Sequence, residues 1–211
     1  MPKTIAPPSR RQAHKLETKR MLQQAALDLF AKLGYDETTT EAIAEKAGVS
    51  PRTFFRYFPT KESVLFVGES DWFQTFADEY VNQPLSLSDV DALRTTFVSL
   101  GPGWVKIRRS LLLYERAVAS SPTLRGVVHD RQQNDITRLA EAIAKRGGRS
   151  RPDERCYLLA AIGLVSHRRV LTKWLAGPAT ADVAELVAAE FDILTGLFET
   201  ASANGRRTKA S

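Results

Sequence analysis

The chain has 211 residues, 43% of them hydrophobic, and a formal net charge of +6, which suits one medium domain or a small domain attached to a larger one. Its single cysteine, Cys156, excludes an intramolecular disulfide framework and a cysteine-rich metal site. The longest apolar run, CYLLAAIGLV, is about half the length that spans a bilayer, and the first residues lack the apolar stretch of a secretory signal. We therefore expect a cytoplasmic protein with no membrane partner.

The positive charge is concentrated at the two ends of the chain. Residues 1–20 contain six Lys or Arg and one Glu, a charge of +5, and residues 205–211 carry +3, so the remainder is −2. We expect residues 1–15 to form a basic flexible arm, in which Arg10 and Arg11 contact nucleic acid, and residues 204–211 to form a basic disordered tail. Segments that only keep the protein soluble would have the same composition, and charge alone leaves both alternatives open.

Residues 16–62 have the pattern of three short helices. Apolar residues recur at helical spacing from Leu22 to Leu33, and Gly34 follows where a helix would end. A second helix begins at the threonines 38–40 and stops at Gly48. This arrangement, with a tight glycine-containing turn before the third helix, predicts a helix-turn-helix.

The third helix has two different faces. Ser50 and Pro51 provide a capping hydroxyl and a proline at the first helical position, and Pro59 ends the helix by Phe58. Phe54 and Phe58 are four residues apart and share a face, which we expect to be buried. The polar side chains then point outward, where they suit an anionic partner.

Residues 63–203 are expected to form a larger helical domain. We predict one continuous helix from Lys61 to about Val81, followed by five helices separated by Pro or Gly. No segment has the alternation of a strand. The predicted fold is all-α, with about nine helices: an N-terminal three-helix domain with a helix-turn-helix, then a larger domain.

Residues 22–65 contain one long motif, in which particular residue types stand at fixed distances from one another. Its members are Ala25, Ala26, Leu29, Phe30, Gly34, Tyr35, Thr38, Thr39, Ile43, Ala44, Ala47, Gly48, Val49, Ser50, Thr53, Phe58, Lys61, Glu62 and Leu65. This set resembles the TetR family of bacterial transcriptional regulators. The rest of the chain is similar to that family in plan, a helical ligand-binding and dimerisation domain. Its SLLLYERAVASSPTLR and VLTKW segments resemble an actinobacterial-type subgroup sometimes tied to acyl-CoA-like ligands.

The resemblance implies contacts with double-stranded DNA. Pro51 and Arg52 would meet base edges, Thr53 and Tyr57 would contact phosphates, and Lys61 would hold the flanking backbone. The candidate DNA-binding residues are Thr39, Thr40, Ser50, Pro51, Arg52, Thr53, Arg56, Tyr57 and Lys61, together with Arg10 and Arg11.

Two residues depart from the family pattern. Phe55 stands where the family often has Tyr, which removes one phosphate hydrogen bond. Glu41 stands where some members carry a basic residue that contacts a base. Its carboxylate would accept from a cytosine amino group or simply face solvent.

The resemblance also implies a homodimer closed by the last two helices of each subunit. An ordinary intramolecular core would have the same apolar pattern, and this alternative stays open. The candidate interface residues are Ala160, Gly163, Leu164, Leu186, Phe191 and Leu194.

Aromatic side chains between the two ends of the chain, among them Trp72, suit an internal pocket for a hydrophobic or amphipathic effector. Arg116 or Arg168 would pair with an anionic head group. A plain aromatic core is the alternative, and His167 with its neighbouring arginines would also fit a solvated turn. The candidate pocket residues are Phe76, Phe97, Trp104, Tyr114, Arg116, His167 and Arg168.

We expect a ligand-released repressor that binds a palindromic operator as a homodimer, with no catalysis, cofactor or metal. The helix from Lys61 to about Val81 would act as a lever between effector and DNA. Two alternatives remain: a helical interaction or ligand-binding protein without DNA affinity, and a thiol enzyme or redox sensor that uses Cys156. No HExxH, GxSxG or P-loop spacing is present.

Overall fold

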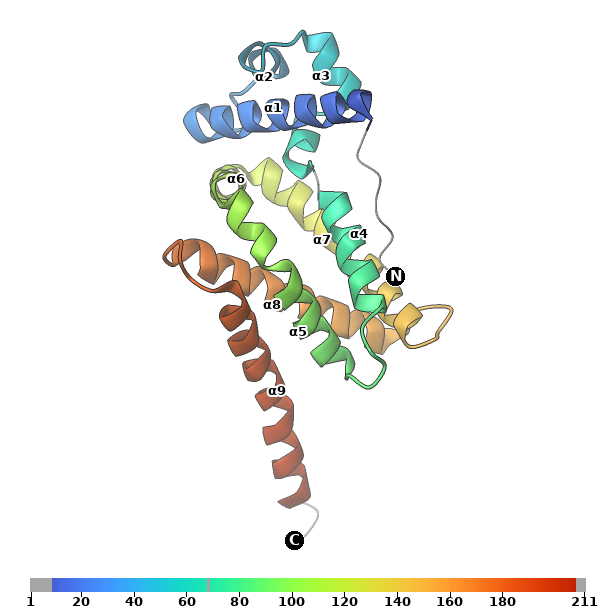
Figure 1. Cartoon of the computed structure of the whole chain (residues 1–211). Coiled ribbons are helices and arrows are strands. Elements are labelled where there is room, and N and C mark those ends of the chain that lie inside the picture. Colours follow the sequence, from blue (N-terminus) through green and yellow to red (C-terminus); the bar gives the residue numbers. More distant parts are fainter. Residues whose placement is uncertain (1–8, 68, 208–211) are drawn as a thin grey trace. The chain divides into compact units, whose positions relative to one another are not determined.

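Helices form every regular element of the computed structural model, which describes residues 9–67 and 69–207 and has no strand within these ranges (Figure 1). This confirms the all-α prediction, with nine α-helices in the described residues. The elements are α1 (Arg10–Leu33), α2 (Thr40–Lys46), α3 (Pro51–Tyr57), the 3₁₀ helix η1 (Glu62–Phe66), α4 (Glu69–Val81), α5 (Asp89–Leu100), α6 (Pro102–Ser120), α7 (Pro122–Arg146), α8 (Glu154–Ala176) and α9 (Val183–Arg207). None of the helices in the described residues is long and apolar enough to cross a membrane.

The chain divides into two units. Unit 1 comprises the residues up to Asp71 and Arg109–Asp130, and unit 2 comprises Trp72–Arg108 and the residues from Arg131 onward. The domain boundary expected after residue 62 therefore does not coincide with the division between units. The physical reason is packing, because Ala117, Val118 and Leu124 belong to the same hydrophobic core as α1–α3.

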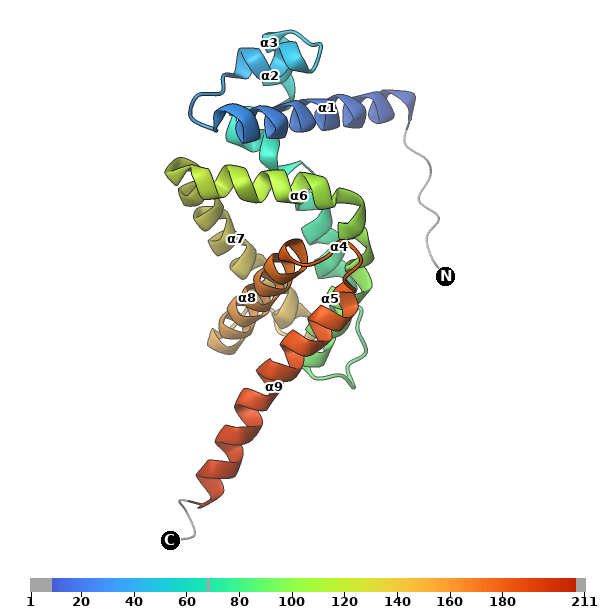
Figure 2. The same cartoon turned by 90° about the vertical axis from the view of Figure 1, so that its left-hand side faces the viewer.

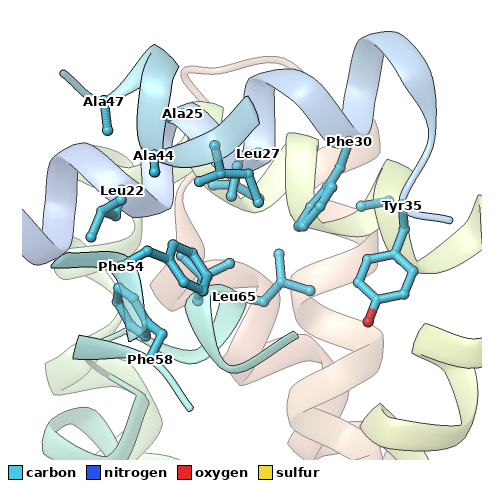
Figure 3. Packing of buried hydrophobic residues seen from close by; sticks show 14 of the residues in the cluster. Leu22, Ala25, Leu27, Phe30, Tyr35, Ala44, Ala47, Phe54, Phe58 and Leu65 are labelled. Carbon is cyan, nitrogen blue, oxygen red and sulfur yellow. The ribbon is translucent and has the colours of Figure 1, made fainter. Parts of the chain in front are cut away.

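The core of unit 1 holds the short helices together (Figure 3). α1 packs on α2 and η1, and α2 packs on α3. Leu22 and Phe30 of α1 meet Ile43 of α2 and Phe54 of α3 in one buried cluster. Phe54 is fully buried and Phe58 is 4% exposed, as the spacing predicted. Their ring centroids are 5.7 Å apart, so one face of α3 is fixed against the core.

Side-chain caps and glycines set the limits of α1, α2 and α3. The Oγ1 of Thr39 accepts a hydrogen bond from the backbone N–H three residues further on (3.1 Å), and the Oγ of Ser50 accepts one from Thr53 N (3.1 Å). Gly34 and Gly48 follow α1 and α2 with φ of 87° and 68°, a left-handed conformation that favours glycine. The predicted start of α3 at Pro51 is confirmed.

Two boundaries expected from the sequence differ in the structure. α1 begins at Arg10, so residues 10–15 of the expected arm are helical; Ala13 N already donates to Ser9 O (2.9 Å). α9 extends to Arg207, so residues 204–207 of the expected tail are helical too. Residues 1–8 and 208–211 lie outside the described residues.

The continuous helix predicted from Lys61 to Val81 is wrong. η1 ends at Phe66, Val67 has the extended conformation (φ −64°, ψ 125°), and α4 begins at Glu69. The next residue in the sequence is Gly68, and glycine is about 1 kcal/mol less favourable than alanine in a helix interior. A single rigid lever along this segment is therefore excluded.

In unit 2, α8 and α9 pack on each other and both pack on α5 (Figure 2). Leu93 and Phe97 of α5, Trp174 of α8 and Phe191 of α9 are all nearly or fully buried. The nearly buried Arg146 closes the α4–α5 connection, because it donates to Asp89 Oδ1 (2.7 Å) and to the carbonyl oxygens of Pro84 (2.6 Å) and Leu87 (2.9 Å).

The C-terminal end of α8 is capped by a side chain from α6. The Nη2 of Arg108 donates to the carbonyl oxygens of Leu175 (3.0 Å) and Gly177 (2.9 Å). Its guanidinium carbon also lies 5.3 Å from the centre of the Trp174 ring. These bonds satisfy carbonyl groups that have no partner inside the helix.

Candidate DNA-binding and ligand sites

The outer face of α3 carries two cations and one aromatic ring. Arg52, Phe55 and Arg56 are all exposed, and their spacing of three and four residues places them on the same side of the helix. Phe55 is 51% exposed, whereas the neighbouring Phe54 is fully buried. The ring of Tyr57 packs partly against the core, and the Arg56 guanidinium lies 5.0 Å from its centre. From the sequence, Phe55 was interpreted only as the loss of a tyrosine hydroxyl, and its exposure was missed.

The candidate hydroxyl groups lie at the beginnings of α2 and α3. Thr39 and Ser50 accept cap hydrogen bonds, and each hydroxyl keeps its proton as a donor. The Oγ atoms of Ser50 and Thr53 are 3.0 Å apart. Thr40 Oγ1 donates to the exposed Glu41 (3.1 Å). The arrangement leaves donors that suit phosphate oxygens.

Lys61 is bound within unit 1, which sequence analysis did not predict. Its Nζ donates to the carbonyl oxygens of Tyr35 (2.7 Å) and Thr38 (2.8 Å) and lies 4.0 Å from the centre of the Tyr35 ring. An ammonium group has three donors, so one remains for a further acceptor.

A further hydrogen bond, between Tyr35 and Glu62, joins the α1–α2 loop to η1. Tyr35 Oη donates to Glu62 Oε2 (3.0 Å). Burial and the bonded carboxylate both raise the pKa of the Tyr35 phenol. Burial opposes ionisation of Glu62, but hydrogen bonds, including the one from Tyr35, lower the pKa of its carboxyl. Near neutral pH, Tyr35 therefore stays a neutral phenol and Glu62 stays an ionised carboxylate.

Arg10 and Arg11 lie in the first turn of α1, and both are exposed. The first turn of α1 contains no acidic residue. Two adjacent cations at this position provide a positive end of unit 1.

The candidate pocket residues separate into two groups. Phe76, Phe97, Trp104 and His167 come together in unit 2, where the Phe76 and Phe97 ring centroids are 4.6 Å apart. Arg168, adjacent to His167 in the sequence, also belongs to unit 2.

The other two candidates belong to unit 1. Tyr114 packs near Phe66, with ring centroids 6.4 Å apart, and Arg116 is exposed. The separation arises because α6 is shared between the units, its residues from Arg109 onward belonging to unit 1.

His167 lies among the aromatic rings of unit 2 rather than in a solvated turn. Its ring centroid is 5.0 Å from those of Phe97 and Trp104 and 5.2 Å from that of Trp72. Burial, reinforced by the positive charge of Arg168, lowers the pKa of His167 to about 4. The imidazole is therefore neutral near pH 7.

The candidate interface residues lie mostly inside unit 2. Ala160 is fully buried, and Phe191 is 1% exposed and packs against Phe97. A Cβ at Gly163 would lie 3.1 Å from Leu93 Cδ1, so this glycine admits a side chain of α5. The structure assigns these three residues to the core of one chain. Leu164 and Leu186 are partly exposed, and Leu194 is 9% exposed.

Other apolar residues of α8 and α9 are exposed and were missed. Leu158 and Val165 of α8 are 64% and 60% exposed, and Ile193 of α9 is 54% exposed. The signal was present in the sequence, because CYLLAAIGLV is apolar around its whole circumference and one packing face cannot cover it.

Cys156 is fully buried in unit 2 near the start of α8. Burial raises the pKa of its thiol, so the reactive thiolate is disfavoured. Within residues 9–67 and 69–207, no group of His, Cys, Asp and Glu side chains has the arrangement of a metal site.

Comparison with known proteins agrees with this geometry. Residues 22–66 match the family model described as bacterial regulatory proteins, tetR family. The HTH-type transcriptional regulator TcmR of Streptomyces glaucescens is 37% identical over 90 residues, which are 43% of this chain and 40% of TcmR. The match thus spans less than half the length of that relative.

Solved structures extend the likeness to most of the chain. The crystal structure of Thermus thermophilus FadR, a TetR family transcriptional repressor in complex with lauroyl-CoA, is 26% identical, with a TM-score of 0.53 over 84% of this chain and 93% of FadR. The complex of SmeT, from Stenotrophomonas maltophilia, with triclosan is 18% identical, with a TM-score of 0.59 over 84% of this chain and 89% of SmeT. Residues 22–66 therefore form a helix-turn-helix domain of the TetR type, and the fold of the chain is that of TetR family regulators.

Proposed function

We propose that the protein is a sequence-specific DNA-binding transcriptional regulator that represses its target as a homodimer and is released by a small effector. The observation that carries this proposal is the two-sided character of α3. One side is fixed in the core by Phe54 and Phe58, and the other presents Arg52, Phe55 and Arg56 to an external partner. A helix held in this way suits the major groove of duplex DNA.

The chemistry of each side chain indicates whether it contacts a base or a phosphate of the DNA. Arg52 forms bidentate hydrogen bonds with a base edge, and guanine is its usual partner. The hydroxyls of Thr39 and Thr53 and the phenol of Tyr57 donate to phosphate oxygens, and Thr40 does so when its hydroxyl turns away from Glu41. The third N–H of Lys61 donates to a flanking phosphate, while the other two hold the α1–α2 loop.

A second copy of the chain completes the binding unit. The exposed apolar side chains of Leu158, Val165 and Ile193 provide a surface on α8 and α9 that a second α8–α9 pair would cover. A two-fold dimer carries two identical α3 helices, so the operator is a palindrome with half-sites about one helical turn, or a multiple of it, apart.

The effector is hydrophobic or amphipathic and binds unit 2. FadR of Thermus thermophilus is bound to lauroyl-CoA and SmeT to triclosan, and both molecules have large apolar parts. Unit 2 of this chain provides a comparable apolar lining in Phe76, Phe97 and Trp104. The effector binds the arrangement with low DNA affinity better than the DNA-bound one, and this difference releases the operator.

A cytoplasmic location and the absence of catalysis belong to the same proposal.

The test of DNA binding is fluorescence anisotropy with duplex DNA from the region upstream of the protein's own gene. Affinity should fall steeply between about 50 and 200 mM salt. Arg52→Ala should weaken specific binding by about 1–3 kcal/mol. Lys145→Ala, which removes an exposed cation of unit 2, is the matched control and should bind as the wild type does. Equal binding by all three proteins, or none by the wild type, would overturn the proposal.

A further inference from the structure

Two nitrogen atoms in the aromatic cluster of unit 2 are enclosed by protein without a hydrogen-bond partner. They are Nε1 of Trp72 and Nε2 of His167. In the described part of the chain, the other side-chain atoms of this kind are the Nε atoms of Arg108 and Arg146, and both of those guanidinium groups make hydrogen bonds through their terminal nitrogens. Buried polar groups almost always have partners, so two unpaired nitrogens in neighbouring rings call for an explanation.

The two rings lie next to each other. Their centroids are 5.2 Å apart with an interplanar angle of 35°. Phe97 stacks on the His167 ring at 5.0 Å, and Trp104 meets it edge to face at 5.0 Å. Trp72 and His167 each keep some solvent-accessible surface, although the two nitrogens themselves are enclosed. The edge of the cluster is thus close to solvent, while its two unpaired nitrogens are enclosed by protein.

The two nitrogens are complementary when the neutral imidazole of His167 carries its proton on Nδ1, which leaves Nε2 as an acceptor. An indole N–H only donates, whereas a neutral imidazole nitrogen without its proton accepts. A hydroxyl group is both acceptor and donor, so one hydroxyl could pair with both rings. The surrounding π faces favour a planar aromatic molecule. The Arg138 guanidinium, 4.0 Å from the centre of the Phe73 ring, and Arg168 make a cationic ligand unfavourable.

We propose that this cluster binds a planar aromatic molecule that carries a hydroxyl group, whose oxygen accepts a hydrogen bond from Trp72 Nε1 and whose proton is donated to His167 Nε2. The inference names the chemical class of the effector and rests on the proposed function for its consequence at DNA. Binding itself is a separate property and is measured without DNA.

The test is calorimetric titration of the full-length protein with three matched probes. 2-Naphthol carries the hydroxyl, 2-methoxynaphthalene keeps only an acceptor, and naphthalene has neither. 2-Naphthol should bind about tenfold more tightly than 2-methoxynaphthalene, and naphthalene should bind most weakly, because each missing hydrogen bond leaves an enclosed nitrogen unpaired.

Two variants remove one nitrogen each and retain an aromatic ring: Trp72→Phe and His167→Phe. Each should reduce the preference for 2-naphthol over naphthalene by about tenfold while keeping affinity for naphthalene. Trp104→Phe is the control, because Trp104 is not one of the residues with an unpaired enclosed nitrogen, and it should weaken all probes alike. Thermal unfolding of each variant checks that it is folded.

The results separate this inference from the proposed function. No binding of 2-naphthol, equal affinities for the three probes, or a preference that survives both variants would overturn the inference. DNA binding is measured apart by anisotropy. A protein that prefers 2-naphthol but binds no DNA would overturn only the proposed regulatory function, and a protein that binds DNA without the preference would overturn only this inference.

Discussion

The ammonium nitrogen of Lys61 lies 2.7 Å from the carbonyl oxygen of Tyr35 and 4.0 Å from the centre of the same residue's ring. With its second bond, to Thr38 O, the side chain ties the start of η1 to the loop between α1 and α2. Lys61 therefore positions α2, and through it the helix-turn-helix, whatever contact it makes with DNA.

Lys61→Ala should destabilise unit 1 as well as weaken DNA binding. The Thr38 carbonyl oxygen loses its bond from Lys61 and that of Tyr35 keeps only the bond from Thr38 N (3.2 Å), which costs about 1–3 kcal/mol. If the third N–H contacts a phosphate, the salt-dependence slope of binding should also fall by about 0.9. Chemical denaturation and anisotropy measure the two effects. A variant of unchanged stability, or one with a changed sequence preference and undiminished affinity, would contradict these roles.

Phe54 and Phe55 form a matched pair of adjacent residues with opposite environments. Phe54→Ala should lower the free energy of unfolding by about 3–5 kcal/mol, because its ring is fully buried. Phe55→Ala removes the same atoms from a half-exposed site and should change stability by no more than about 0.5 kcal/mol. Equal losses in denaturant melts would show that α3 is not held by one face.

The exposed ring of Phe55 should contact DNA. Phenylalanine makes apolar contact with the thymine methyl group. Replacing single thymines of the operator by uracil removes only that methyl, and one replacement per half-site should weaken wild-type binding. Phe55→Ala should bind the thymine and uracil operators equally well. A uracil effect that persists in Phe55→Ala would assign the methyl contact to another residue.

Stability should depend on pH through His167. Its pKa is about 4 in the folded chain and about 6.5 when unfolded, so the unfolded state binds more protons between these values. The free energy of unfolding should therefore fall as pH decreases from about 6.5 to about 4, by about 2–3 kcal/mol in total. His167→Phe should show a smaller decline, since only carboxyl groups such as Glu62 then contribute to it, whereas His129→Phe, at an exposed position, should retain the full decline. Melting curves recorded across this range measure the difference.

Local signals in the sequence predicted unit 1 well. Thr39, Ser50 and Pro51 mark helix starts by their own hydrogen-bonding and backbone chemistry, and Gly34 and Gly48 mark the turns. The burial of Phe54 and Phe58 followed from spacing alone. These features depend on neighbours within a few residues, which a sequence displays directly.

Features that depend on distant contacts were missed. Nothing near Lys61 in the sequence indicates that its ammonium binds carbonyl oxygens more than 20 residues earlier. Gly163 predicted the close approach of another helix, and the side chain next to it is Leu93 of the same chain. The sequence also contained no sign that Tyr114 packs near Phe66 in unit 1, because periodicity cannot show that α6 is shared between two cores.

The exposed apolar residues of α8 and α9 should control dimerisation. Leu158→Arg and Ile193→Arg place a charge on the surface that a second copy would cover, and sedimentation should then detect monomers at concentrations where the wild type is a dimer. Val105→Arg, at a 56% exposed position of α6, is the matched control and should stay dimeric. If the two variants stay dimeric, the interface lies elsewhere. DNA affinity should fall with the dimer, because one α3 contacts only a half-site.

Arg10 and Arg11 should contribute to DNA binding and not to folding. Both are exposed in the first turn of α1, where the helix dipole favours anions, so two cations there give the helix no stability. Arg10→Ala combined with Arg11→Ala should leave the melting temperature unchanged or slightly raised. The slope of log affinity against log salt should become shallower by about 0.9 for each phosphate that the double variant no longer neutralises. Lys145→Ala should leave the slope as it is. Because slope and affinity respond to phosphate neutralisation while solubility does not, an unchanged slope in the double variant would assign this basic segment to solubility alone.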